Sequence, residues 1–189
     1  GMINGINSRE MILEILLEIE EGEHSHVAIR NALSKYQFLP KQDRAFITRV
    51  CEGTLEYRIQ IDYIINSFSK VTVDKMKPAI REILRSAVYQ LKYMDSVPDS
   101  AVCNEAVKLA QRKGFYNLKP FVNGVLRTIV RELKNLELPS REENEVRYLS
   151  VKYSMPEYLV NKWIDAYGVK TTEKILEDFL TERPLTVRC

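Results

Sequence analysis

Apolar residues recur every three or four positions along almost the whole chain, which is the period of an α-helix. The most regular run lies between Ile80 and Leu91, where every expected position is apolar. Glycine and proline number only seven each in 189 residues, so few positions interrupt the pattern. Before residue 180 we find no paired strand pattern and no glycine-rich phosphate loop. The sequence therefore predicts an all-α fold, an antiparallel helical bundle followed by a few short helices.

Turn and capping residues divide this pattern into separate segments. The helices of the bundle are expected over residues 8–22, 25–36, 43–68, 78–91, 100–114 and 120–133. Gly53 lies inside the third segment, and the sequence leaves open whether it breaks that segment into two helices. The last two helices are joined by a short connection, so they should pack as an antiparallel hairpin.

A boundary is expected at Leu138–Arg141, where a proline stands among polar residues between two apolar patterns. It divides the chain into a helical domain over 1–138 and a second part over 139–189. The second part should hold three short helices, in which Trp163 and Tyr167 form a small core. These helices are expected over residues 146–153, 159–167 and 175–180.

The last six residues, 184–189, resemble the beginning of a β-strand. A single strand has no partner for its backbone groups and would be marginal alone. We therefore expect this chain to be a fragment that stops where a further domain begins.

Charge is distributed unevenly, although the net charge is only +2. Residues 14–23 contain five acids and no base, whereas residues 108–134 contain seven bases and one acid. Phosphate backbones are bound chiefly by such local positive fields. Tyr116 and Phe121 lie in the same stretch and could stack on unpaired bases. The alternative interpretation is a solvated helix face with ordinary packing aromatics.

Several kinds of site are not supported by the residues present. The three cysteines, Cys51, Cys103 and Cys189, are widely spaced, and the two histidines, His24 and His26, have no third ligand near them. We therefore expect no disulfide framework and no metal site, and a reducing cytoplasm as the setting. No segment is long and apolar enough to cross a membrane.

Two polar residues occupy positions where the helical period expects apolar ones. We expect Glu105 and Asn123 to form hydrogen bonds between helices, with Arg44 or Arg85 as the partner of Glu105. A catalytic Glu105 would need a nucleophile or metal beside it, and the sequence offers neither. No catalytic residue is therefore predicted in this chain.

Five motifs occur in an order that resembles the NusB family, an all-helical RNA-binding family, over roughly residues 6 to 135. They are Asp43-Arg44-Ala45-Phe46, Glu52-Gly53-Thr54-Leu55, Leu84-Arg85-Ser86-Ala87-Val88-Tyr89-Gln90-Leu91, Asn104-Glu105-Ala106-Val107 and Phe121-Val122-Asn123-Gly124-Val125-Leu126-Arg127.

A narrower resemblance covers nearly the whole chain. Residues 148–160, Trp163, Tyr167-Gly168 and 183–188 are similar to the segment that follows the NusB-like module in RsmB/Sun-type 16S rRNA (cytosine-5)-methyltransferases. This resemblance implies the N-terminal part of such an enzyme, with 16S rRNA and the protein's own methyltransferase domain as partners. In that family the following domain binds S-adenosylmethionine and carries the catalytic cysteines, so this chain should hold no cofactor and no catalytic centre.

The resemblance also implies RNA contacts. Arg9, Asn117 and Phe121 match regions of NusB that take part in RNA binding. NusB has an arginine-rich leader, whereas residues 2–8 contain no base, which favours an auxiliary contact in which basic side chains hold phosphates. The expected RNA-binding residues are Arg9, Lys108, Arg112, Lys113, Asn117, Lys119, Phe121, Arg127 and Arg131. A helical protein-interaction scaffold and a stand-alone antitermination factor are the alternatives.

Overall fold

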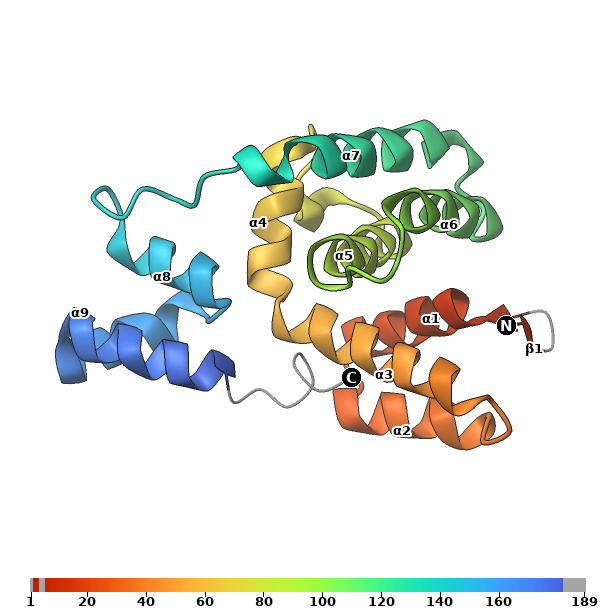
Figure 1. Cartoon of the computed structure of the whole chain (residues 1–189), viewed down its shortest axis with the longest axis horizontal. Coiled ribbons are helices and arrows are strands. Elements are labelled where there is room, and N and C mark those ends of the chain that lie inside the picture. The colour runs from red at the N-terminus through yellow and green to blue at the C-terminus, as the bar shows by residue number, and fades with distance from the viewer. Residues whose placement is uncertain (1, 4–5, 182–189) are drawn as a thin grey trace.

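The computed structural model describes residues 2–3 and 6–181 and is almost entirely helical (Figure 1). Its elements are β1 (Met2–Ile3), β2 (Ile6–Asn7), α1 (Ser8–Glu20), α2 (Ser25–Lys35), α3 (Lys41–Glu56), α4 (Arg58–Phe68), η1 (Val73–Lys75), α5 (Pro78–Tyr93), α6 (Asp99–Arg112), η2 (Tyr116–Leu118), α7 (Lys119–Glu132), η3 (Leu133–Asn135), α8 (Glu145–Tyr153) and α9 (Glu157–Thr181). The predicted all-α class is confirmed. Residues 184–189, which are predicted to begin a β-strand, lie outside the described residues.

One short sheet was not expected. β1 pairs with β2 in antiparallel register, Met2 opposite Asn7 and Ile3 opposite Ile6. Apolar periodicity missed this pair because a two-residue strand is too short to show alternation.

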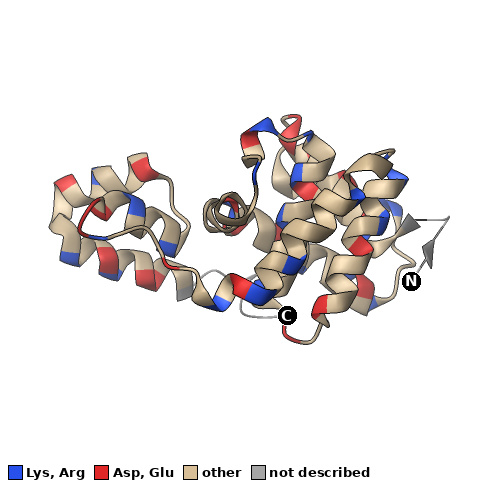
Figure 2. Cartoon of the chain, turned by 90° about the horizontal axis from the view of Figure 1, so that it is seen from above, with Lys and Arg blue, Asp and Glu red and all other residues tan. Residues whose placement is uncertain are grey.

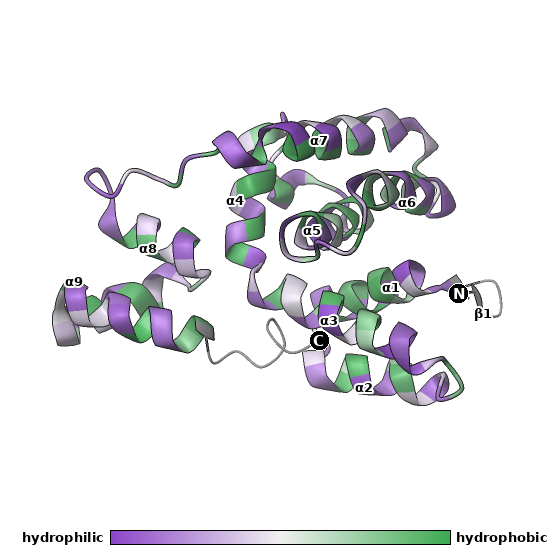
Figure 3. Cartoon of the chain, in the orientation of Figure 1, coloured by the Kyte–Doolittle hydropathy of each residue, from purple (hydrophilic) through white to green (hydrophobic). Residues whose placement is uncertain are grey.

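Helix α5 is the centre of the bundle (Figure 1). It packs against α1, α3, α4, α6 and α7, and eleven of its residues are buried, polar ones included. The surrounding helices are amphipathic instead: α7 is hydrophilic on its outer side and hydrophobic on the side that faces α5 (Figure 3). Burial of this apolar surface is the main force that holds the bundle together.

The segment predicted over 43–68 is two helices, but Gly53 does not separate them. Helix α3 continues through Gly53, and the chain bends at Tyr57, whose backbone leaves the helical region. Gly53 is buried, and a Cβ atom at this position would overlap the ring of Tyr89. The glycine is therefore required by close packing of α3 on α5, not by a turn.

Residues beyond 144 build a second, smaller core. Its buried members are Leu149, Tyr153, Met155, Val160 and Leu176, and Trp163 packs against them as predicted. The two helices predicted over 159–167 and 175–180 are both present within α9, and they are separated by a kink at Gly168, where φ is 81° and the backbone leaves the helical region. The expectation for Tyr167 is wrong, because its side chain is 58% exposed.

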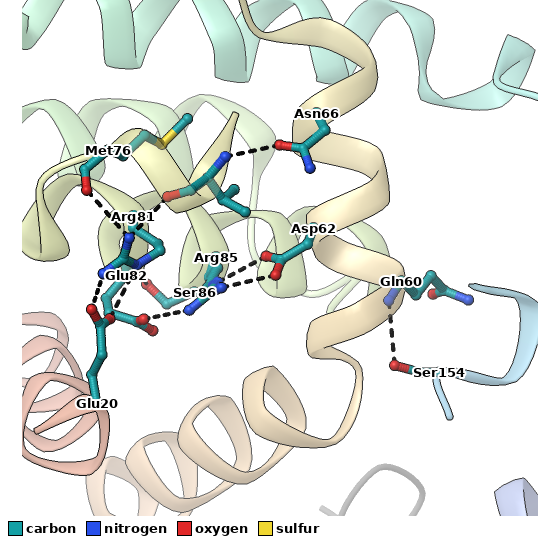
Figure 4. Close-up of polar contacts among 11 residues, drawn as sticks. Glu20, Gln60, Asp62, Asn66, Met76, Arg81, Glu82, Arg85, Ser86 and Ser154 are labelled. Atoms are coloured by element: carbon teal, nitrogen blue, oxygen red, sulfur yellow. Dashed lines mark hydrogen bonds and ion pairs between the residues drawn. The ribbon is translucent and has the colours of Figure 1, made fainter. Parts of the chain in front are cut away.

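An ionic network joins α1, α4 and α5 inside the bundle (Figure 4). Arg85 donates Nε and Nη2 to the two carboxylate oxygens of Asp62, at 2.8 Å each, and Nη1 to Glu82 at 2.7 Å. Arg81 pairs with Glu20. The expectation that Arg85 would pair with Glu105 is therefore wrong, since its three donor nitrogens are engaged by acids of α4 and α5.

The network predicts a pH-dependent stability. Burial, and a hydrogen bond with Glu20, raise the pKa of Glu82 from its ordinary value of 4.5 to about 8. Between these two values the folded chain binds a proton that the unfolded chain does not, so the free energy of unfolding should fall as the pH rises from 4.5 to 8.

Chemical denaturation of wild type and Glu82→Gln across this pH range measures the effect. The amide stands in for the protonated carboxyl, so the variant should lose most of the fall that the wild type shows. Equal slopes for the two proteins would contradict the assignment.

The sequence also predicted no disulfide framework, no metal site and no membrane-spanning segment. Cys51 and Cys103 are buried, and burial raises the pKa of both thiols, which agrees with a packing role. Within residues 2–3 and 6–181 no three His, Cys, Asp or Glu side chains lie close enough to hold a metal ion. No helix in the same ranges has the length and apolarity to cross a bilayer.

Candidate nucleic-acid interface

The α6–α7 hairpin predicted from the sequence is confirmed, and it carries most of the expected RNA-binding residues. Helices α6 and α7 pack along each other, and η2 connects them. A shallow groove of about 450 Å³ runs between the two helices. It is lined by Asn104, Val107, Lys108, Lys119, Pro120 and Asn123. We call it the α6–α7 groove.

Arg127 fixes the orientation of two amides at this groove. Its Nη2 donates to Oδ1 of Asn104 at 3.0 Å, and its Nε donates to Oδ1 of Asn123 at 3.2 Å. Because each Oδ1 is directed at the guanidinium, each Nδ2 group is left available as a donor. The expectation that Asn123 bonds between helices is wrong, because its bond with Arg127 lies within α7; the connection from α7 to α6 is made by Arg127 and Asn104.

The two lysines of the groove add further donors. Lys119 lies 4.5 Å from the ring centre of Tyr116 and donates to the Gln111 amide oxygen at 2.8 Å. Lys108 is exposed, with Glu105 3.4 Å away. The α6–α7 groove therefore presents mainly N–H donors, which suits a ligand rich in acceptors, such as phosphate oxygens or the O and N acceptors of bases.

Glu105 does not pair as predicted. Its nearest cation is Lys108, one turn further along α6, and its charge also acts on Arg9. Arg44, the other expected partner, lines a separate groove between α2 and α3. Helix-surface pairs of this kind contribute little to stability, so Glu105 does not determine the fold in the way expected.

The aromatic residues near η2 differ in what they can offer a base. Phe121 is half-buried and packs against the main core, whereas Tyr116 is 64% exposed. Asn117, in η2, is also exposed. An open ring is needed for stacking, so Tyr116 is better placed than Phe121 to stack on an unpaired base.

Part of the positive charge of residues 108–134 is matched by the acidic helix α1. Arg112 pairs with Glu10, and Lys113 pairs with Glu14 at 2.5 Å. Arg131 lies 3.7 Å from Glu132. Figure 2 accordingly shows basic and acidic residues mixed over the bundle. The two oppositely charged segments are far apart in sequence and face each other across the contact between α1 and α6. Helical periodicity could not predict this pairing, because it describes residues of one helix only.

A second groove adjoins the first, because Lys108 lines both. It measures about 700 Å³ and brings Arg9 and Arg112 together with Glu105 and Asp43. Arg9 is half-buried, with its guanidinium 5.3 Å from the ring centre of Phe46 and Nε 3.3 Å from the Gln90 amide oxygen. Burial lowers the pKa of Arg9.

The expected residues therefore fall into three sets. Lys108, Lys119 and Arg127 gather at the α6–α7 groove, with Asn117 and Phe121 in or just after η2, where α7 begins. Arg9 and Arg112 lie in the adjoining groove, which has mixed charge. Lys113 and Arg131 line neither groove. The prediction did not include Asn104 and Asn123, which line the α6–α7 groove; the signal available for them was an asparagine on each of two helices predicted to pack together.

Comparison with known proteins places these features in a family. The sequence profile of the NusB family matches residues 6–131. The chain is 36% identical over 182 residues to a probable ribosomal RNA small subunit methyltransferase B of Bacillus subtilis, which covers 95% of this chain and 40% of that relative. It is 35% identical over 133 residues to the transcription antitermination protein NusB of Dictyoglomus thermophilum, which covers 68% of this chain and 88% of that protein.

The fold has a counterpart among solved structures. A chain of the crystal structure of antitermination factors NusB and NusE in complex with dsRNA superposes with a TM-score of 0.60 at 21% identity, over 66% of this chain and 93% of that one. The chain spans about two fifths of the length of the methyltransferase relatives that it matches. The two predicted resemblances, to NusB and to RsmB/Sun-type methyltransferases, are confirmed.

Proposed function

Because the chain belongs to the NusB family, we propose that it is the RNA-binding, substrate-positioning N-terminal part of an S-adenosylmethionine-dependent 16S rRNA cytosine-5 methyltransferase. On this proposal the methyl transfer and the cofactor belong to a methyltransferase domain outside these residues. The protein acts in the cytoplasm, where its two partners are 16S rRNA and its own methyltransferase domain.

The extent of the two similarities carries this proposal. The similarity to the antitermination protein covers 68% of the chain, whereas the similarity to the methyltransferase covers 95%. The match to the NusB family ends at residue 131, so the part beyond α7, where α8 and α9 form their own core, lies outside it. We therefore favour the methyltransferase over a stand-alone antitermination factor or a general scaffold, and we place the boundary between the two parts at residues 138–139.

The α6–α7 groove supports the RNA-binding half of the proposal. Its amides and lysines offer donors from two helices, and a phosphate or a base edge offers the acceptors that they need. Binding RNA on a rigid helical hairpin orients the target before the chemical step, which converts binding energy into proximity. No side chain of this region needs to take part in bond making.

Salt titration of RNA binding tests the proposal. The probe is a bacterial small-subunit rRNA transcript, and the variant is Lys108→Gln/Lys119→Gln/Arg127→Gln. We expect RNA affinity to fall, and the slope of log affinity against log salt to flatten by about 2, since each phosphate contact to a single strand contributes roughly 0.7. Filter binding from 50 to about 300 mM salt measures both.

A matched control removes the same charge from another surface. Arg30, Lys41 and Arg44 are exposed on α2 and α3, and Arg30→Gln/Lys41→Gln/Arg44→Gln should leave affinity and slope close to wild type. Equal losses in both triple variants would show only a general charge effect. Wild-type binding by the groove variant would remove the RNA role from this face.

A further inference from the structure

Gln60 lies on α4 at the place where the bundle meets α8. It is 7% exposed although it is polar, and α4 packs on α8 along this face. A buried amide of this kind is destabilising unless all of its polar atoms are bonded. The partners of Gln60 therefore indicate why a glutamine occupies this position.

Every hydrogen-bonding group of the Gln60 side chain has a partner. Nε2 donates to the backbone oxygens of Val151 at 3.3 Å and Lys152 at 3.1 Å, both in the last turn of α8. Oε1 accepts from the hydroxyl of Tyr93, at the end of α5. The amide thus connects the centre of the bundle to carbonyls that end a helix and lack partners within it.

The backbone of Gln60 adds a third bond to the same region. Its N–H donates to Oγ of Ser154 at 3.3 Å (Figure 4). Ser154 is the C-cap of α8 and has a φ of 53°, the one non-glycine residue with positive φ among those described. This backbone region is unfavourable for a residue other than glycine, and the Ser154 hydroxyl is used in the contact with α4.

The segment that precedes α8 also contacts α4. Tyr63, one turn after Gln60, donates its hydroxyl to the backbone oxygen of Glu137 at 2.7 Å. The guanidinium of Arg147, in the first turn of α8, lies 5.9 Å from the centre of the Tyr63 ring. The connection after η3 and both ends of α8 are therefore attached to α4.

From these contacts we propose that Gln60 is a positioning residue that locks α8 and α9 onto the bundle in one orientation. The side-chain amide donates hydrogen bonds to two backbone carbonyls at the end of α8. Only a hydrogen-bond donor at this position can bond to them. As a consequence that rests on the proposed function, RNA held in the α6–α7 groove keeps a fixed orientation relative to α9. The contact between α4 and α8 that Gln60 forms, called the joint below, does not depend on RNA.

Spin-label distance measurements on the 189-residue chain test the joint. Cysteines replace the exposed residues Ser100, on α6, and Lys174, on α9, in a Cys189→Ser background, since Cys51 and Cys103 are buried. The unchanged joint should give one narrow distance distribution between the labels. Q60E replaces the donor by a carboxylate that faces two carbonyl oxygens, so it should broaden or shift the distribution.

Two further variants separate orientation from stability. Tyr93→Phe removes the bond to Oε1 and leaves the α8 contacts, so its distribution should stay narrow. Gln60→Met removes the bonds without adding charge and should also broaden the distribution, which keeps the test open if Q60E does not fold. Acid should narrow the Q60E distribution again, because a protonated carboxyl regains a donor.

A narrow, unshifted distribution in Q60E and Gln60→Met would overturn the proposal, even if both variants melted earlier. RNA affinity is measured in parallel. Q60E should bind the rRNA transcript as wild type does, and the groove variant should keep the narrow distribution. Failure of RNA binding in the wild type would therefore count against the proposed function and leave the joint intact.

Discussion

Replacing Arg85 by methionine is expected to lower the free energy of unfolding by about 3–5 kcal/mol at pH 7. The arginine is 9% exposed and holds both carboxylate oxygens of Asp62 and one oxygen of Glu82. Removing it leaves the carboxylate of Asp62 without its cation, and a charge deprived of its partner costs more than the pair contributed. Urea unfolding followed by circular dichroism measures the loss.

Arg141 provides the matched control. It also pairs with two carboxylates, Glu145 and Glu173, but its side chain is exposed on the surface of the second part of the chain. Exposed pairs are weakened by water and salt, so Arg141→Met should cost less than about 1 kcal/mol. A second comparison, Arg85→Met/Asp62→Leu, should recover part of the loss because it removes the orphaned charge. Equal costs for the two single variants would show that burial does not set the energy.

Gly53→Ala is expected to lower the free energy of unfolding by about 3 kcal/mol. Alanine normally strengthens a helix by about 1 kcal/mol relative to glycine, so the expected sign is opposite to that of helix propensity. The new methyl group would occupy the position of the Tyr89 ring, which is fully buried and lies against the rings of Tyr57 and Tyr93. Thermal unfolding should show a melting temperature lower by about 10 °C.

The chain contains its own control for this change. Gly124 lies in α7 with open space where a Cβ would stand, so Gly124→Ala should stabilise the protein by up to about 1 kcal/mol. In the variant Gly53→Ala/Tyr89→Leu, the smaller side chain makes room for the methyl group, and the double loss should be less than the sum of the single losses. A stabilising Gly53→Ala would contradict the close packing described above.

Much of the bundle was predictable because helical periodicity is a local property. The stripe of α5 from Ile80 to Leu91 and the α6–α7 hairpin follow from residues three and four apart, and both are present. The position of the bend between α3 and α4 was not predictable. Glycine is the usual signal for a break, and at Gly53 it serves a contact with α5, 36 residues away in sequence.

The candidate site was only partly predictable. Counting charges found the basic stretch 108–134, but it could not show that Arg112 and Lys113 face the acids of α1, about 100 residues earlier. The donors that define the α6–α7 groove depend on Arg127 holding Asn104 and Asn123, a geometry that needs two packed helices. Individual contact residues therefore remain a prediction for the binding experiments above.

The sequence by itself determined the helical class, the order of the helices and the family, because all three depend on residue type and spacing along the chain. Only the tertiary structure decided which charges are neutralised, which amide hydrogens are left for a ligand, and how Gln60 fastens α8 and α9 to the bundle. The physical reason is range. Periodicity acts within one turn of a helix, whereas ion pairing, donor orientation and burial depend on side chains that only folding brings within a few ångströms of each other.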